Sequence, residues 1–80
     1  DLVQSSHRVV YGLALRVLGS SPEAEDVTQE AYLRVWQARR QYDPRRRFDA
    51  WVARIAWNLC KTRLAKEKRQ VSLLDQDVES

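Results

Sequence analysis

The sequence predicts an all-α fold, a three-helix bundle-like domain in which a loop precedes a long third helix. Apolar residues recur at intervals of three and four in three segments, and glycine and proline are scarce, with two of each in 80 residues. No segment shows the alternation that is typical of strands. A chain of this length supports one small core. We expect residues 1–70 to form the domain and residues 71–80 to begin a linker.

The first helix is expected from Leu2 to Leu18, with Gly19 behind it as a C-cap. His7 has no acid or nucleophile nearby in sequence, so we interpret it as a solvated side chain. The predicted buried stripe consists of Val3, Val10, Leu13, Val17 and Leu18.

The second helix is expected at about residues 22–40. Ser21 can cap it, and Pro22 fits the first helical position, where a missing N–H costs nothing. Acidic residues fill its first turns, and Arg39 and Arg40 close its far end, as the helix dipole favours. The predicted buried stripe consists of Ala24, Val27, Ala31 and Val35, with Tyr32 and Trp36 flanking it.

The third helix should start near Phe48 and run to about Gln70. Residues 41–44 break the helical pattern before it, because the residue that precedes Pro44 avoids the helical region. One arc of this helix, roughly 100° wide, is apolar, and another is polar. The apolar arc holds Phe48, Trp51, Val52, Ile55 and Leu59, and the polar arc holds Arg54, Trp57, Asn58 and Lys61.

Several classes of function are excluded by missing residues. Cys60 is the single cysteine, so it forms no disulfide within the chain and no zinc spacing, and we expect it to be half-buried. No histidine lies near a nucleophile, and no glycine-rich phosphate loop is present. No apolar run is long enough to cross a bilayer. We therefore expect a cytoplasmic protein that is not an enzyme and that has no metal or cofactor.

The net charge of +3 conceals a strong asymmetry. Residues 1–33 hold two basic and five acidic side chains, residues 34–69 hold twelve basic and three acidic ones, and residues 70–80 hold three acids. The middle of the chain is thus suited to a polyanion, and the first third to a basic partner.

The basic segment also carries aromatic residues, which is typical of nucleic-acid binding because cations neutralise phosphates and exposed rings stack on unpaired bases. The alternative is a solvated helix face with aromatic residues in the core. We assign Trp51 to the core, whereas Trp57 points away from the apolar arc. The segment comprises Tyr42, Arg45, Arg46, Arg47, Trp51, Arg54, Trp57, Lys61, Arg63, Lys66, Lys68 and Arg69.

A second polar strip lies on the second helix. Asp26, Gln29 and Glu30 share one face, and Leu33 continues it. This strip could dock a basic helix of a partner, although ordinary solvation explains the same spacing.

Two stretches resemble a known family. Residues 24–36, AEDVTQEAYLRVW, resemble the "AEDLVQEVFLRVW" stretch of extracytoplasmic-function (ECF) sigma factors. Residues 48–59, FDAWVARIAWNL, resemble their "F-x-x-W-L-x-R-I-A-x-N" stretch, with no gap needed between the two. The resemblance implies region 2, the sigma-2 domain, which binds the β′ coiled coil of RNA polymerase core and opens the promoter −10 element. It also implies that residues 71–75 start an interdomain linker.

The resemblance implies a role for individual residues. The implied polymerase contacts are Asp26, Gln29, Glu30, Leu33 and Arg34. The implied contacts to the non-template single strand are Tyr42, Arg45, Arg46, Arg47, Arg54, Trp57, Asn58, Lys61 and Thr62. Asn58 corresponds to a base-reading position, and residues 42–47 to a loop that receives a flipped base. Thr62 stands where many members have Asp, and Trp57 where many have a polar residue.

Two alternatives remain open. The chain could be a helical protein-interaction module whose main ligand is an anti-sigma factor, which in this family commonly covers the polymerase-docking surface. A double-stranded DNA repressor would need a short turn before a recognition helix, and the loop at residues 42–47 is a poor match for that. The chain opens without methionine, in mid-pattern, so we expect it to be a fragment.

Overall fold

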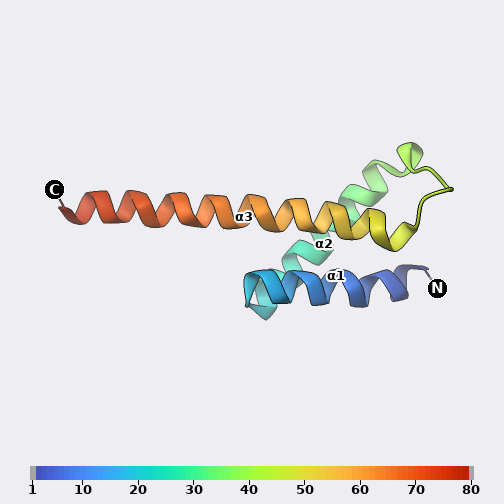
Figure 1. Ribbon diagram of the computed structural model, residues 1–80, viewed down its shortest axis with the longest axis horizontal. Coiled ribbons are helices and arrows are strands. Elements are labelled where there is room, and N and C mark those ends of the chain that lie inside the picture. The colour runs from blue at the N-terminus through green and yellow to red at the C-terminus, as the bar shows by residue number, and fades with distance from the viewer. Residues whose placement is uncertain (1, 80) are drawn as a thin grey trace.

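The computed structural model describes residues 2–79, with side chains for residues 4–69. It contains α1 (Leu2–Leu18), α2 (Ser21–Gln37), the short 3-10 helix η1 (Arg39–Gln41) and α3 (Phe48–Glu79). Over these residues there is no strand, so the predicted all-α fold is confirmed. In Figure 1, α1 and α3 run in the same direction, α2 crosses them, and the second half of α3 projects past both. This projection makes the molecule long, 54 × 24 × 16 Å.

The core lies where the three helices meet and is built from small side chains. All four residues predicted for the α2 stripe are buried. Alanine and valine dominate, which lets the helix axes approach closely. The buried apolar residues are Val10, Ala14, Ala24, Val27, Ala31, Val35, Val52, Ala56, Leu59 and Cys60.

Helix α1 ends as the sequence predicts. Gly19 adopts a left-handed conformation with φ of 69°, and its N–H donates to the carbonyl of Leu15 at 2.8 Å. Of the predicted stripe, Val10 is fully buried, Leu13, Val17 and Leu18 pack partly buried against the core, and Val3 has a side chain outside the described residues.

The predicted ends of α2 are wrong by a few residues. Ser20, not Ser21, is the N-cap, and it makes no side-chain cap hydrogen bond. Ser21 is the first helical residue, so Pro22 takes the second position, and the hydroxyl of Ser21 hydrogen-bonds that of Tyr11 at 2.7 Å. At the other end α2 stops at Gln37 and tightens into η1, so Arg39 and Arg40 belong to the 3-10 turn and not to α2.

Helix α3 differs from its prediction in two respects. It continues to Glu79, nine residues past Gln70, so the backbone of residues 71–79 is helical. Whether these residues begin a linker stays a prediction, because their side chains lie outside the described residues. Cys60 is completely buried rather than half-buried. It lies with Ala56 on the side of α3 that contacts the other helices.

Candidate interaction surfaces

Four polar residues of the second helix and one leucine gather on the outward side of α2, which we call the α2 face: Asp26, Gln29, Glu30, Leu33 and Arg34. The side chain of Asp26 is 69% exposed and Leu33 is 55% exposed, so both are open to a partner. Gln29 lies toward α1, where it lines a hollow with His7 and Tyr11. Glu30 and Arg34 lie toward α3. The predicted set therefore forms one continuous surface.

Two arginines partly neutralise the carboxylates of the α2 face. Glu30 receives Arg34 from its own helix, with Nη2 and Oε1 3.5 Å apart, and Arg63 from α3, with Nη2 and Oε2 3.6 Å apart. The other terminal nitrogen of Arg63 lies 4.0 Å from Oδ2 of Asp26. The sequence predicts Arg63 among the nucleic-acid-binding cations, and that role stays a prediction. In the structure the guanidinium of Arg63 lies beside the two carboxylates of the α2 face.

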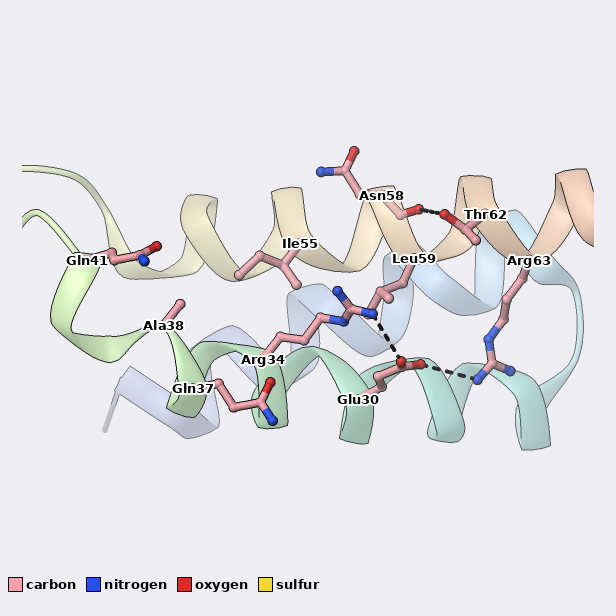
Figure 2. A pocket seen from close by; sticks show the side chains of 10 residues that line it. All are labelled: Glu30, Arg34, Gln37, Ala38, Gln41, Ile55, Asn58, Leu59, Thr62 and Arg63. Carbon is pink, nitrogen blue, oxygen red and sulfur yellow. Dashed lines mark hydrogen bonds and ion pairs between the residues drawn. The ribbon is translucent and has the colours of Figure 1, made fainter.

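A groove of about 510 Å³ separates α2 from the middle of α3. Its floor is apolar, with Ile55 and Leu59, and its rim is polar. Figure 2 shows Arg63 reaching from α3 to Glu30, and Arg34 rising from α2 toward Leu59. The groove thus links the α2 face to the helix that carries Asn58.

Trp36 belongs to the outward side of α2 rather than to the flank of its core. Its side chain is 62% exposed, and the guanidinium of Arg39 lies 4.0 Å from the ring centroid. Arg39 also donates to the carbonyl of Trp36 at 2.7 Å. The spacing in the sequence indicates this exposed position, because Trp36 follows Leu33 by three residues and so lies on the same side of the helix.

The loop between η1 and α3 is built around Tyr42. Its ring stacks on Trp51 with centroids 4.8 Å apart and meets Phe48 edge-on at 5.9 Å. Its hydroxyl donates to the carbonyl of Arg46 at 2.6 Å. Tyr42 is therefore half-buried, and one ring face is covered by Trp51. These contacts hold Tyr42 between the loop and α3, and its contact with DNA stays a prediction.

Two of the three loop arginines are held by neighbouring carboxylates. Asp43 accepts from the backbone N–H of Arg45 at 3.0 Å and from its Nε at 3.2 Å, and these two contacts, in that order, lower the pKa of Asp43. Arg47 pairs with Asp49 at 3.0 Å. Among the described side chains, Arg46 has no carboxylate within ion-pair distance.

The polar arc of α3 is exposed as predicted, and we call it the α3 face: Arg54, Trp57, Asn58, Lys61 and Thr62. Trp57 is 43% exposed, with the ammonium of Lys61 5.9 Å from its ring centroid. The hydroxyl of Thr62 donates to the backbone carbonyl of Asn58 at 3.0 Å, which leaves the amide of Asn58 unconstrained by this contact. Asn58 points away from α2 in Figure 2.

The loop and the α3 face meet in a second hollow of about 320 Å³, which we call the arginine hollow. Trp51 contributes an aromatic surface, and Arg46, Arg47 and Arg54 line the same hollow. An aromatic surface beside several guanidinium groups can stack a planar base and hold its phosphates. The sequence predicts Trp51 in the core. It is half-buried, and it serves both the core and this hollow.

Other chemistry has little support in the side chains of residues 4–69. No group of three or more metal-ligating side chains comes together there. No helix of residues 2–79 is long and apolar enough to cross a bilayer. His7 is exposed, as expected, and its ring lies 6.2 Å from those of Tyr11 and Tyr32.

The comparisons with known proteins agree with this geometry. The family model of Sigma-70 region 2 matches residues 2–70. The ECF RNA polymerase sigma factor SigW of Bacillus subtilis is 40% identical over 68 residues, 85% of this chain and 36% of that protein. The ECF RNA polymerase sigma factor SigE of Mycolicibacterium smegmatis is 41% identical over 59 residues, 74% of this chain and 23% of that protein.

A more distant relative shows the same pattern of coverage. The RNA polymerase sigma-H factor of Pseudomonas aeruginosa is 32% identical over 69 residues, 86% of this chain and 36% of that protein. The chain thus spans about a third or less of the length of these relatives. No solved structure matches it.

Proposed function

Because this chain belongs to the Sigma-70 region 2 family and resembles its ECF members, we propose that it binds RNA polymerase core and the promoter −10 element on two separate surfaces. The α2 face docks on the β′ coiled coil. The loop and the α3 face hold the non-template single strand. Sigma factors are transcription initiation factors and not enzymes, so family membership confirms the expectation that the chain has no catalytic role.

The arginine hollow is the observation that carries the DNA half of the proposal. Exposed cations alone would suit any polyanion, whereas a half-buried tryptophan that lines one hollow with three arginines suits an unpaired base with its phosphates. Base flipping costs a few kcal/mol. Stacking and hydrogen bonds that only a single strand can make offset that cost, and the amide of Asn58 can both donate and accept at a base edge.

The docking half rests on the charge and exposure of α2. Asp26 and Glu30 offer carboxylates, and Leu33 and Trp36 offer apolar surface beside them. A basic helix with a few apolar residues would satisfy both groups at once. The domain would act in the cytoplasm, where polymerase and promoter DNA are present.

The docking assignment is tested by titrating the labelled chain with RNA polymerase core. Glu30→Lys should weaken binding about tenfold or more, because it places a third cation beside Arg34 and Arg63. The far-ultraviolet circular dichroism spectrum should be unchanged, since Glu30 lies outside the core. Native affinity of the folded variant would overturn the assignment of this face.

The DNA assignment is tested with one oligonucleotide sequence in two forms. The chain with core should bind the single strand more tightly than the duplex, because a base must leave the duplex stack before it can stack on Trp51 in the arginine hollow. Arg54→Gln should reduce the preference. Equal binding of the two forms would favour a duplex-binding protein.

An anti-sigma factor is a second partner for the same surface. The exposures of Leu33 and Trp36, 55% and 62%, leave an apolar patch that would be covered in either complex. A regulator that covered this patch would exclude polymerase by occupying the α2 face. Competition between the two for the wild-type chain is the expected result.

A further inference from the structure

We infer that Arg63 is an internal counter-charge of the α2 face, which limits the affinity of that face for a basic partner, and that it is not a contact to DNA. The inference deepens the docking half of the proposed function and rests on it. Arg63 is one of the cations that charge counting alone places with the nucleic-acid-binding segment.

The position of Arg63 on α3 separates it from the α3 face. Nine residues separate Arg54 from Arg63, and at about 100° per residue the two side chains leave the helix about 180° apart. Arg54 lines the arginine hollow, whereas Arg63 lines the groove against α2. Asn58 and Thr62 of the α3 face border the same groove as Arg63, but a strand of DNA held at Arg54 would run along the side of the helix opposite Arg63.

The guanidinium of Arg63 occupies the place that a partner's cation would take. Its two terminal nitrogens lie 3.6 Å from Glu30 and 4.0 Å from Asp26, the two carboxylates of the α2 face. With Arg34 also 3.5 Å from Glu30, both oxygens of that carboxylate already face a cation. An incoming lysine or arginine must share these carboxylates with Arg63 or displace it.

The contacts are long and partly solvated, which makes displacement easy. The side chains of Arg63 and Glu30 are 35% and 39% exposed, and Asp26 is 69% exposed. Ion pairs of this kind contribute little to stability. Removing the charge of Arg63 should therefore lower the free energy of unfolding only slightly. It should also make the α2 face more negative by one unit charge toward a basic partner.

The size of the effect follows from the charge alone. One unit charge about 7 Å from an incoming cation, in a water-like dielectric, changes an affinity by about threefold. Arg63→Gln should thus strengthen binding to RNA polymerase core about threefold at low ionic strength, mainly through a faster on-rate, and the gain should fade as salt is added. Arg63→Lys should restore wild-type binding.

The experiment compares Arg63→Gln with Arg54→Gln, the same substitution on the opposite side of the same helix. Stopped-flow titration with polymerase core should show a faster on-rate for Arg63→Gln and no change for Arg54→Gln. Salt titration with single-stranded DNA should show the reverse: a shallower slope for Arg54→Gln, by about 0.7 for one lost phosphate contact, and the wild-type slope for Arg63→Gln.

Three results would overturn the inference. A shallower DNA slope for Arg63→Gln would make Arg63 a phosphate contact, and weaker core binding would make it a support of the docking surface. An unchanged on-rate would mean that it does not compete. Glu30→Lys distinguishes a failure of this inference from a failure of the proposed function. If Glu30→Lys weakens core binding while Arg63→Gln leaves it unchanged, the role given to Arg63 is wrong and the α2 face is still the docking surface.

Discussion

The α2 face and the arginine hollow pair their charges in different ways. On the α2 face Glu30 is met by Arg34 of its own helix and also, across the groove, by Arg63 of α3, which reaches Asp26 as well. In and beside the loop all the pairs are local, Arg45 with Asp43 and Arg47 with Asp49, two residues apart in each case. The contacts of Arg63 therefore depend on how α2 and α3 pack, whereas the pairs of Arg45 and Arg47 depend only on neighbours in the chain.

This difference determines which charged and apolar groups of each surface remain available to a partner. Among the described side chains, Arg46, Arg54 and Lys61 have no carboxylate within ion-pair distance. The surface proposed for DNA therefore keeps uncompensated positive charge. On the α2 face most of the carboxylate charge is matched by Arg34 and Arg63, so exposed Leu33 and Trp36 should supply much of the contact.

The largest expected effect comes from the core that both surfaces share. Ile55→Ala should lower the free energy of unfolding by about 2 kcal/mol, the low end for such truncations because Ile55 is only half-buried. Chemical denaturation measures it, and both core and DNA binding should weaken as the folded fraction falls. Loss of only one binding activity, with unchanged stability, would show that the two surfaces do not depend on one core.

Asn58→Ala should act on base preference alone. Asn58 is exposed on the α3 face, so its truncation leaves no cavity, and discrimination at one base should fall by about 1–3 kcal/mol. Binding to single-stranded oligonucleotides altered one position at a time measures this. A uniform loss of affinity across the set would indicate that Asn58 positions the backbone, and no loss would leave base reading to the loop.

Arg46→Ala and Lys61→Ala should each remove about one phosphate contact. The log–log salt slope for single-stranded DNA should become shallower by about 0.7 for each variant, with polymerase binding unchanged. Arg45→Ala is the matched control, because Arg45 already pairs with Asp43 and should change the slope less. Equal effects of all three would mean that the local pairing does not matter.

The smallest expected effect concerns Cys60, which is buried in the core shared by the three helices. Burial raises the pKa of its thiol, and the nearby charge of Arg63 opposes this more weakly. The folded chain therefore holds the thiol proton more tightly than the unfolded chain, whose thiol has a pKa of 9.0. The protonated thiol of Cys60 therefore contributes its full share to the free energy of unfolding below pH 9.0. This contribution is lost as the pH rises through the pKa that the thiol has in the folded chain.

A thiol reagent should accordingly react with Cys60 far more slowly in the native chain than in the denatured one. Rapid labelling of the native chain at pH 8 would contradict the buried position. Arg63→Gln removes the opposing charge and should slow native labelling slightly further, which offers a second view of that side chain.

Much of the fold follows from local pattern. The stripe of Ala24, Val27, Ala31 and Val35 is buried as predicted because a 3.6-residue repeat alone decides which side of a helix is apolar. Gly19 is predicted correctly because its left-handed conformation is specific to glycine. The capping role of Ser21 is wrong because two serines compete there and Tyr11, from another helix, bonds the hydroxyl of Ser21.

The candidate surfaces could be predicted from the sequence only where their residues belong to a single helix. The α3 face follows from helical spacing, and its residues are exposed as expected. The position of Arg63 depends on where α3 crosses α2, which residue types do not reveal. The stacking of Tyr42 on Trp51 likewise joins a loop to a helix nine residues later, so neither ring could be placed from the pattern of its own segment.

Polymerase and DNA bind separate surfaces in the proposed function, and a paired titration tests this separation. Glu30→Lys and Lys61→Gln are each titrated with RNA polymerase core and with single-stranded DNA. We expect Glu30→Lys to lose core affinity and keep its DNA salt slope, and Lys61→Gln to keep core affinity and have a shallower DNA slope. If each variant changed both activities by similar factors, polymerase and DNA would share one surface, and the proposal of two surfaces would be wrong.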